Sequence, residues 1–206
     1  MKLTITTNVS VDGVMQGLGA PDEDRRGGFD RGGWAPPLLD TESEDYLKEV
    51  YQRAAAFLFG RRTYEIFAGS WGAIPAMSTS PIGAALNSRP KYVVSTSLTD
   101  PQWAGTSVLS GDVAAAVGDL KAHQDGELLV PGSGVLVRWL LANELVDQLD
   151  MVIYPVVVGM GTRLFPDTGP AMALELVESR STPSGVTIQT YRPAGRPQYA
   201  TGTPPT

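Results

Sequence analysis

The stretch LLVPGSGVLVRWLL (residues 128–141) joins an apolar run to a helical segment through a Pro-Gly-Ser-Gly turn. A short apolar run that ends at a turn is typical of a buried strand, and the residues after this turn have the apolar spacing of a helix. The same order recurs in AAFLFGRRTYEIF (residues 55–67), where a glycine again separates the two segments. A strand followed at once by a helix, found twice, predicts an α/β fold whose central strands lie parallel in one sheet.

Outward from these two units, strands and helices continue to alternate along the chain. Further strands are expected at residues 2–9, 91–95, 106–109 and 148–158, and further helices from Thr41 or Ser43 and over 112–122. The segments 13–40 and 69–90 contain glycines and prolines without a sustained apolar period, so we expect them to be irregular. Residues 173–180 and 186–191 are typical of a hairpin closed by Thr-Pro-Ser-Gly. The expected fold is an α/β sandwich with a mostly parallel central sheet and an antiparallel C-terminal hairpin.

Length and composition predict one folded domain with a short tail. The 206 residues are 42% hydrophobic and 18% charged, which is enough apolar material for one core, expected over residues 1–192. Residues 193–206 hold four of the sixteen prolines and almost nothing apolar, so we expect them to form a flexible tail.

The charged and chemistry-bearing residues exclude several kinds of site. A net charge of −6 argues against broad binding of nucleic acid or of an anionic membrane. The chain has no cysteine and one histidine, His123, so disulfides, thiolate zinc sites and multi-histidine metal centres are excluded and no metal is expected. We interpret His123 as a solvated residue at a helix end. No long apolar run occurs, so the default expectation is a cytoplasmic protein.

The first candidate binding site follows the expected strand that ends at Gly60. A glycine there lets a ligand approach the backbone, and the free N–H groups of the helix that follows favour phosphate. Arg61 and Arg62 add planar hydrogen-bond donors for an anion, and Thr63 adds a hydroxyl. The alternative, which we weigh equally, is a pair of solvated arginines that bind nearby acids such as Glu65.

A second candidate is the turn Gly132-Ser133-Gly134, which also leads from a strand into a helix. Its glycines allow close approach, although a tight turn with a serine cap explains the pattern as well. Ser95 and Thr96, after another expected strand, are a weaker signal. Because parallel strands place their carboxyl ends at one edge of a sheet, these sites together indicate a ligand with several phosphates. A dinucleotide and a mononucleotide both fit.

Acidic and aromatic side chains are candidates for the reacting end of the site. Asp12 follows the first strand, and Glu44 and Asp45 open the next helix. A carboxyl group in a cleft could donate a proton or hold the substrate, while turn formation and the helix dipole are the simpler explanations. Trp34, in the glycine-rich segment, packs either on a planar ligand or on the core.

The order of these motifs resembles that of one known family. The resemblance rests on NVSVDGVM (8–15), a loop with GGW (32–34), LFGRRTYEIF (58–67), KYVVSTSL (91–98) and the stretch from LVDQLD to YPVVVGMGTRLF (145–165). These are similar to the dihydrofolate-reductase-like fold, and within it to the C-terminal reductase domain of the bifunctional riboflavin-biosynthesis deaminase-reductase. The resemblance covers about residues 1–192 and implies a three-layer α/β sandwich.

The resemblance also implies NADPH as the hydride donor and assigns roles by position. The residues that would hold the cofactor are Gly60, Arg61, Arg62, Thr63, Ser95, Thr96, Gly132, Ser133, Gly134 and Val135. Those that would contact the substrate are Asp12, Trp34, Asp45, Tyr154 and Pro155. Asp12 and Glu44 are the candidates for a catalytic acid.

The implied reaction is reduction of 5-amino-6-(5-phosphoribosylamino)uracil in riboflavin biosynthesis. The alternatives are a reductase of pterins or of another C=N or C=O substrate, and a non-catalytic nucleotide- or drug-binding protein on the same fold. A phosphorylated substrate needs basic groups, which Arg25, Arg26 and Arg31 could supply, although we slightly favour ordinary solvated charges. A homodimer is also implied, and residues 150–158 are a candidate interface.

Overall fold

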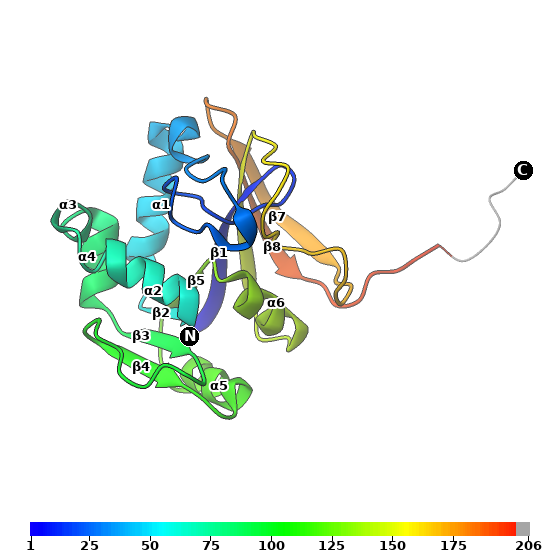
Figure 1. Cartoon of the computed structure of the whole chain (residues 1–206). Helices are drawn as coiled ribbons and strands as arrows, with labels where there is room; N and C mark the ends of the chain where they lie inside the picture. The colour runs from blue at the N-terminus through cyan, green and yellow to red at the C-terminus, as the bar shows by residue number, and fades with distance from the viewer. Residues whose placement is uncertain (201–206) are drawn as a thin grey trace, which may run out of the picture.

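The computed structural model describes residues 1–200 and is built on one twisted eight-stranded sheet (Figure 1). Its strands, in chain order, are β1 (Lys2–Ser10), β2 (Ala56–Gly60), β3 (Lys91–Val94), β4 (Thr106–Leu109), β5 (Glu127–Pro131), β6 (Gln148–Tyr154), β7 (Leu174–Ser181) and β8 (Thr187–Pro193). Across the sheet they are ordered β4-β3-β2-β5-β1-β6-β8-β7. Strands β1 to β6 pair in parallel, whereas β8 pairs antiparallel with β6 and with β7. The expected parallel centre and antiparallel hairpin are confirmed.

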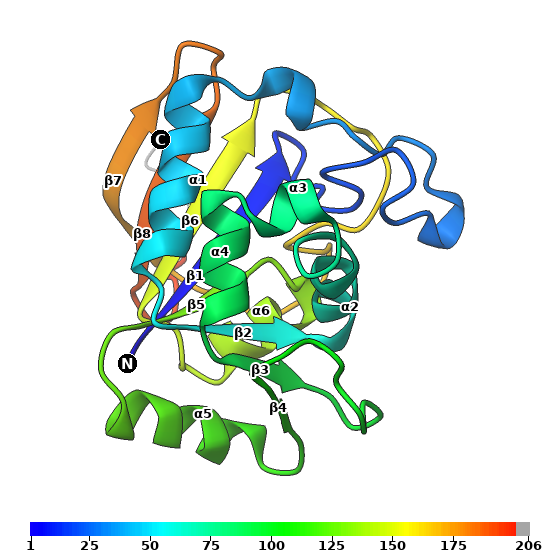
Figure 2. The same cartoon turned by 90° about the vertical axis from the view of Figure 1, so that its left-hand side faces the viewer.

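Helices cover both faces of the sheet and complete three layers. They are α1 (Thr41–Arg53), α2 (Arg61–Ser70), α3 (Pro75–Ser78), α4 (Pro81–Ser88), α5 (Val113–His123) and α6 (Gly134–Ala142). Figure 2 looks onto the face covered by α1 to α4, and α5 and α6 lie on the opposite face. The expected three-layer sandwich is therefore the observed one.

The alternation of side chains along β2 shows why the sheet needs cover on both faces. Phe57 and Phe59 belong to the core under α1, α2 and α4, while Ala56 and Leu58 belong to the core under α5 and α6. All four are fully buried. Because successive side chains of a strand point to opposite faces, an uninterrupted apolar run is what a doubly covered strand requires.

The segment 69–90 departs from the prediction, because it holds α3 and α4 rather than irregular chain. Ser80 is the N-cap of α4 and accepts a hydrogen bond from the Gly83 backbone N–H at 3.1 Å. Pro81 follows at the first helical position, where the missing N–H of proline costs nothing. The Ser-Pro pair was a helix-start signal, and the prediction was wrong in reading its proline only as a breaker.

The expected strand 148–158 is also too long, since β6 ends at Tyr154 and the chain then turns. The Val156 N–H donates to the Tyr154 carbonyl at 2.7 Å, which closes that turn. Strand β6 lies between β1 and β8 inside the sheet, so its backbone is fully paired. Strand β6 therefore has no free edge for pairing with another chain, and the candidate dimer interface over 150–158 stays a prediction.

The C-terminal hairpin extends a little beyond the range expected for the domain. Strand β8 includes Pro193, and Ala194 and Gly195 still exchange backbone hydrogen bonds with Ala173. The rest of the tail expected at 193–206 leads away from the sheet, and residues 201–206 lie outside the described part (Figure 1). Within residues 1–200, no helix is both long and apolar enough to cross a membrane.

Candidate functional site

A large cleft opens over the carboxyl ends of the parallel strands. Its volume is about 1550 Å³, and it takes lining residues from the ends of β1, β2, β3, β5 and β6. Ligands of open α/β sheets bind at this edge because the strand ends leave a crevice there between neighbouring loops. The cleft therefore lies where the sequence placed its candidate anion sites.

The two glycine turns meet at this edge and are tied together. The Gly60 backbone N–H donates to the Ser133 hydroxyl oxygen at 3.0 Å, which joins the end of β2 to the turn after β5. Gly132 and Ser133 both have positive φ, at 74° and 67°, so this turn is a left-handed one. A Cβ on Gly134 would lie 2.6 Å from the sulfur of Met15, so the flexible Met15 side chain packs close to the backbone of this turn. Gly60, Gly132, Ser133, Gly134, Val135 and Thr63 all line the cleft.

Two of the helices that begin at the cleft, α2 and α6, lack a side-chain cap, as does the short helix α3. The side chains of Asp40, Ser80 and Asp112 cap α1, α4 and α5. Helices α2 and α6, which start at Gly60 and Ser133, have no side-chain cap. Their first-turn N–H groups are therefore available to a ligand, and the positive ends of their dipoles favour an anion.

Arg61 connects the main cleft with a smaller neighbouring pocket. Its Nη1 donates to the Ser97 hydroxyl at 2.5 Å, and its Nε donates to a carboxylate oxygen of Glu65 at 2.7 Å. The smaller pocket has a volume of about 330 Å³ and is lined by hydroxyl residues, among them Ser95 and Thr96. Arg61 thus pairs with Glu65, as the second alternative expects, and it also lines both adjoining pockets, so its role in binding an anion stays a prediction.

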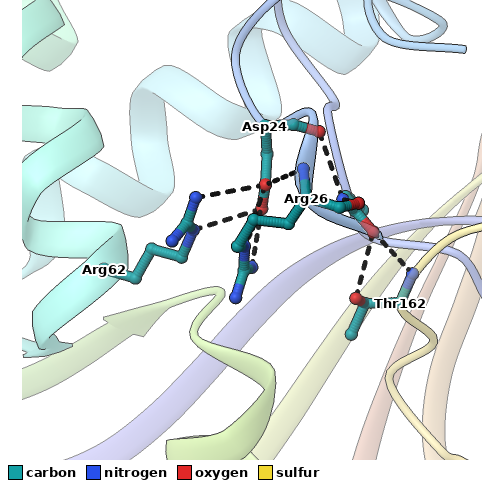
Figure 3. Close-up of polar contacts among 5 residues, drawn as sticks. Asp24, Arg26, Arg62 and Thr162 are labelled. Atoms are coloured by element: carbon teal, nitrogen blue, oxygen red, sulfur yellow. Dashed lines mark hydrogen bonds and ion pairs between the residues drawn. The ribbon is translucent and has the colours of Figure 1, made fainter. Parts of the chain in front are cut away.

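Arg62 contacts a loop carboxylate, Asp24, that the sequence analysis missed (Figure 3). Asp24 accepts two hydrogen bonds from Arg62, at 3.2 and 3.3 Å, and is bound more closely by Arg26, at 2.6 Å. The side chain of Asp24 is only 7% exposed. Hydrogen bonds from Arg26 outweigh burial and lower the pKa of Asp24 to about 2, so the carboxylate is charged at neutral pH.

Gln16 connects the loop that carries Asp24 to Thr162, which lies after β6. Its amide nitrogen donates to the carbonyls of Asp24 and Arg26, and its amide oxygen accepts from the backbone and hydroxyl of Thr162 (Figure 3). Its own carbonyl accepts from the Trp34 indole at 2.9 Å. No local pattern marked the contact of Asp24 with Arg62 or that of Gln16 with Thr162, because these partners are distant in the sequence.

Asp12 does not line the cleft, although it was expected to act there. Its carboxylate accepts from the backbone N–H groups of Val158 and Gly159, at 3.0 and 2.8 Å, and from the Ser10 hydroxyl at 2.6 Å. Burial raises the pKa of Asp12, but these hydrogen bonds outweigh it and lower the pKa to about 2. Such a group is a poor proton donor near neutral pH, and its contacts favour a role in positioning the loop after β6.

The aromatic residues expected near the substrate take separate positions. Tyr154 lines the cleft and donates from its hydroxyl to the amide oxygen of Asn8 at 3.1 Å. Burial raises the pKa of Tyr154 well above its usual value. Trp34 packs edge-on against Tyr154 with 5.6 Å between ring centres, so it supports the cleft wall from behind rather than facing a ligand. Pro155 is exposed and lies outside the cleft.

The acids at the start of α1 also divide between cleft and solvent. Glu44 lines the cleft, whereas Asp45 does not. Lys48 binds both, at 3.6 Å from Glu44 and 2.9 Å from Asp45. Glu44 is therefore the one candidate catalytic acid that the fold brings to the cleft.

Comparison with known proteins gives a matching family model and a relative that covers most of the chain. A family model described as the RibD C-terminal domain matches residues 1–188. The uncharacterized protein YyaP of Bacillus subtilis (strain 168) is 24% identical over 196 residues, which covers 92% of this chain and 94% of that protein.

Two solved structures share the fold. A putative riboflavin biosynthesis protein from Shewanella sp. PV-4 superimposes with a TM-score of 0.68 at 21% identity, over 94% of this chain and 99% of that one. A dihydrofolate reductase from Enterococcus faecalis, complexed with NADP(H) and RAB-propyl, gives a TM-score of 0.61 at 18% identity, over 94% and 96%. At these identities the likeness concerns the fold, which is dihydrofolate-reductase-like.

Proposed function

The chain belongs to the RibD C-terminal domain family, and on this premise we propose that it is an NADPH-dependent reductase of a small heterocyclic substrate. The observation that carries the proposal is the pair of uncapped helix starts, joined by the hydrogen bond between Gly60 and Ser133. Two positive helix ends at one glycine-lined edge are suited to the two phosphates of a pyrophosphate, whereas a surface arginine alone would not indicate such a ligand.

The size of the cleft supports two ligands side by side. Pockets for one small ligand measure roughly 300 to 1,000 Å³. This cleft measures about 1550 Å³, and a further pocket adjoins it at Arg61. A dinucleotide along the glycine turns leaves the part of the cleft between α1, α2 and α4 for a substrate.

The adjoining pocket supports NADPH rather than NADH. Arg61 and the hydroxyls of Ser95, Thr96 and Ser97 surround it, which is the donor set that a 2′-phosphate needs. Arg62 is half-exposed but shares the Asp24 carboxylate with Arg26, so it is less free to bind a phosphate. We therefore assign the selectivity for NADPH to Arg61.

When bound, the nicotinamide supplies a hydride to an electrophilic carbon of a C=N or C=O bond. The residues of this chain orient the two ligands and shield the reacting carbon from water. A proton must reach the nitrogen or oxygen of the same bond, and of the two acids that the sequence offered for this step, Asp12 and Glu44, Glu44 is the one that lines the cleft. The substrate candidates are the phosphorylated pyrimidine of riboflavin biosynthesis and a pterin or another C=N or C=O compound.

Titration of the purified protein with NADPH and with NADH, followed by nicotinamide fluorescence, tests the proposal. We expect selective binding of NADPH, and at least a tenfold loss of that selectivity in Arg61→Ala, roughly one hydrogen-bonded charge pair. Arg192→Ala is the control, since Arg192 is an exposed residue of β8 that lines neither pocket. Binding of neither nucleotide would contradict the reductase function and leave a binding protein on the same fold.

A further inference from the structure

Resting on the proposed reductase function, we infer that the substrate is an uncharged, largely apolar planar compound with a C=O or C=N bond, and not a phosphate ester. The reduction would transfer a hydride from NADPH to the carbon and a proton to the oxygen or nitrogen. It would yield a neutral alcohol or amine together with NADP⁺.

The first observation is the apolar wall of the cleft beyond the glycine turns. Helix α1, the 3-10 turn Pro36–Leu38 and helices α2 to α4 contribute side chains that are only partly covered by the protein. These are Leu39, Leu47, Phe67, Trp71, Met77 and Ile82. Ile74 lies with them and is 46% exposed. Apolar side chains gathered in a concave site are stabilised by an apolar ligand that displaces water from them.

The second observation is that the basic side chains left for a substrate are already bound to acids. Arg26 and Arg62 share Asp24, which is 7% exposed. Lys48 binds Glu44 and Asp45. Arg61 is assigned to the cofactor, and both side chains of its pair with Glu65 are about half exposed, so that pair is weak enough to exchange for a phosphate. A phosphate ester would have to compete with these carboxylates for its cations.

The charge of the whole cleft points the same way. Its lining includes five acidic residues, Glu23, Asp24, Glu44, Glu65 and Asp112, against the four basic ones, Arg26, Lys48, Arg61 and Arg62. Only Lys48 belongs to the part near the apolar wall, on α1. The other arginines that the sequence offered for a phosphate lie outside the cleft: Arg25 is exposed, and Arg31 donates to the Val158 carbonyl at 2.5 Å. A dianionic substrate would therefore meet an apolar surface and one lysine that is already paired with two acids.

Binding of 1-aminoanthracene, a neutral planar probe whose fluorescence rises in apolar surroundings, tests the apolar wall. We expect saturable binding that weakens at least tenfold in Ile74→Lys. Phe165→Lys is the matched control, because Phe165 is 48% exposed and lies outside the cleft. Unchanged thermal unfolding of both variants establishes that they are folded. Absence of binding, or equal loss in the two variants, overturns the inference.

Displacement of the probe by uridine and by uridine 5′-monophosphate tests the exclusion of phosphate, since the two differ only in that group. The titrations are made with saturating NADP⁺ and repeated without it. We expect the monophosphate to displace the probe no better than uridine does. Displacement by the monophosphate at a tenfold lower concentration overturns the inference.

Failure of this inference and failure of the reductase function give different results. If NADPH binds and the monophosphate is preferred, the reductase proposal stands and the substrate class is wrong. If NADPH does not bind but the probe does, and Ile74→Lys abolishes probe binding while Phe165→Lys does not, the apolar site stands without the reductase function.

Discussion

At the scale of single residues, Asp12 and Asp24 show that the contacts of a carboxylate decide whether it belongs to the cleft or holds a loop in place. Both carboxylates have a pKa of about 2 and both are largely buried. Asp24 lines the cleft and holds two arginines, whereas Asp12 points to the loop after β6. The same residue type, at two positions twelve residues apart, thus shapes the charge of the site in one case and supports its wall in the other.

We expect Asp12→Asn to lower stability without changing the affinity for NADPH. The amide has one acceptor oxygen, so one of the N–H groups of Val158 and Gly159 loses its partner, at a cost of about 1 to 3 kcal/mol. Because the pKa of Asp12 is lower in the folded chain than its ordinary value, the carboxylate stabilises the fold above pH 4, and this contribution is lost as the pH falls towards 2. Urea unfolding at pH 7 and at pH 3 measures both effects. A large rise in the dissociation constant of NADPH would contradict the positioning role.

Lys91 gives a second prediction at this scale, and here the charged form of the side chain destabilises the fold. It is fully buried under the Trp103 ring, 4.9 Å from its centre, and donates to the carbonyls of Leu86 and Arg89. Burial lowers its pKa to about 8. The unfolded chain therefore binds the proton more strongly, and we expect the free energy of unfolding to rise between pH 8 and about 10.4, by up to about 3 kcal/mol. Lys91→Met removes this rise, and urea unfolding of the two proteins from pH 7.5 to 10 measures it; equal pH profiles would contradict the expectation.

At the scale of elements, the turn between β5 and α6 is coupled to the turn between β2 and α2. Ser133 provides the coupling through its hydroxyl and holds a left-handed conformation. A side chain that spans two loops also explains why α6 has no cap of its own, because its N-cap serine is occupied by Gly60.

We expect Ser133→Ala to weaken NADPH binding several-fold and to lower the free energy of unfolding by about 1 kcal/mol, the net value of one hydrogen bond. The hydroxyl is lost while the backbone conformation is equally strained in both proteins. Ser88→Ala is the control, since the Ser88 hydroxyl donates only to carbonyls within α4. Fluorescence titration and urea unfolding measure the two effects. Unchanged affinity in Ser133→Ala would mean that the turns act independently.

At the scale of the whole molecule, cofactor binding and folding are linked. A ligand that binds only the folded chain adds about 2.7 kcal/mol at one hundred times its dissociation constant. For a chain of this size we expect Tm to rise by roughly 5 to 10 °C with NADPH, and less with NADH at the same concentration. Differential scanning fluorimetry measures the rise. Equal shifts with the two nucleotides would contradict the role given to Arg61 and its pocket.

One edge strand of the sheet, β7, indicates that the protein forms a dimer. Strand β7 is the last strand on its side, and Leu176 and Val177 are 53% and 46% exposed on it. An exposed apolar edge strand is a ready surface for pairing with another chain. We expect a homodimer of about 44 kDa, twice the 21.9 kDa of one chain, and a monomer for Leu176→Lys. Analytical ultracentrifugation measures both masses, and a monomeric wild-type protein would contradict the expectation.

The sequence by itself determined the sheet and the position of its binding edge. Apolar runs such as residues 56–59 have no stable place except a strand covered on both faces, and a glycine at the end of such a run leads directly into a helix. These are local properties, which is why Gly60, Arg61 and the Gly132-Ser133-Gly134 turn could be placed in advance and all line the cleft. The helix α4 was equally local, and its Ser-Pro start was misread.

Only the tertiary structure decided what each polar side chain does. Asp24 and Arg62 are 38 positions apart, and Gln16 and Thr162 are 146 apart, yet each pair is in direct contact. A sequence pattern records periodicity over a few residues, whereas the free energy of a charge depends on which distant partners surround it. The neutralised arginines, the apolar wall and the removal of Asp12 from the cleft all follow from such distant contacts. For that reason the glycine turns at the cleft could be predicted from the sequence, and the partners of its charged side chains could not.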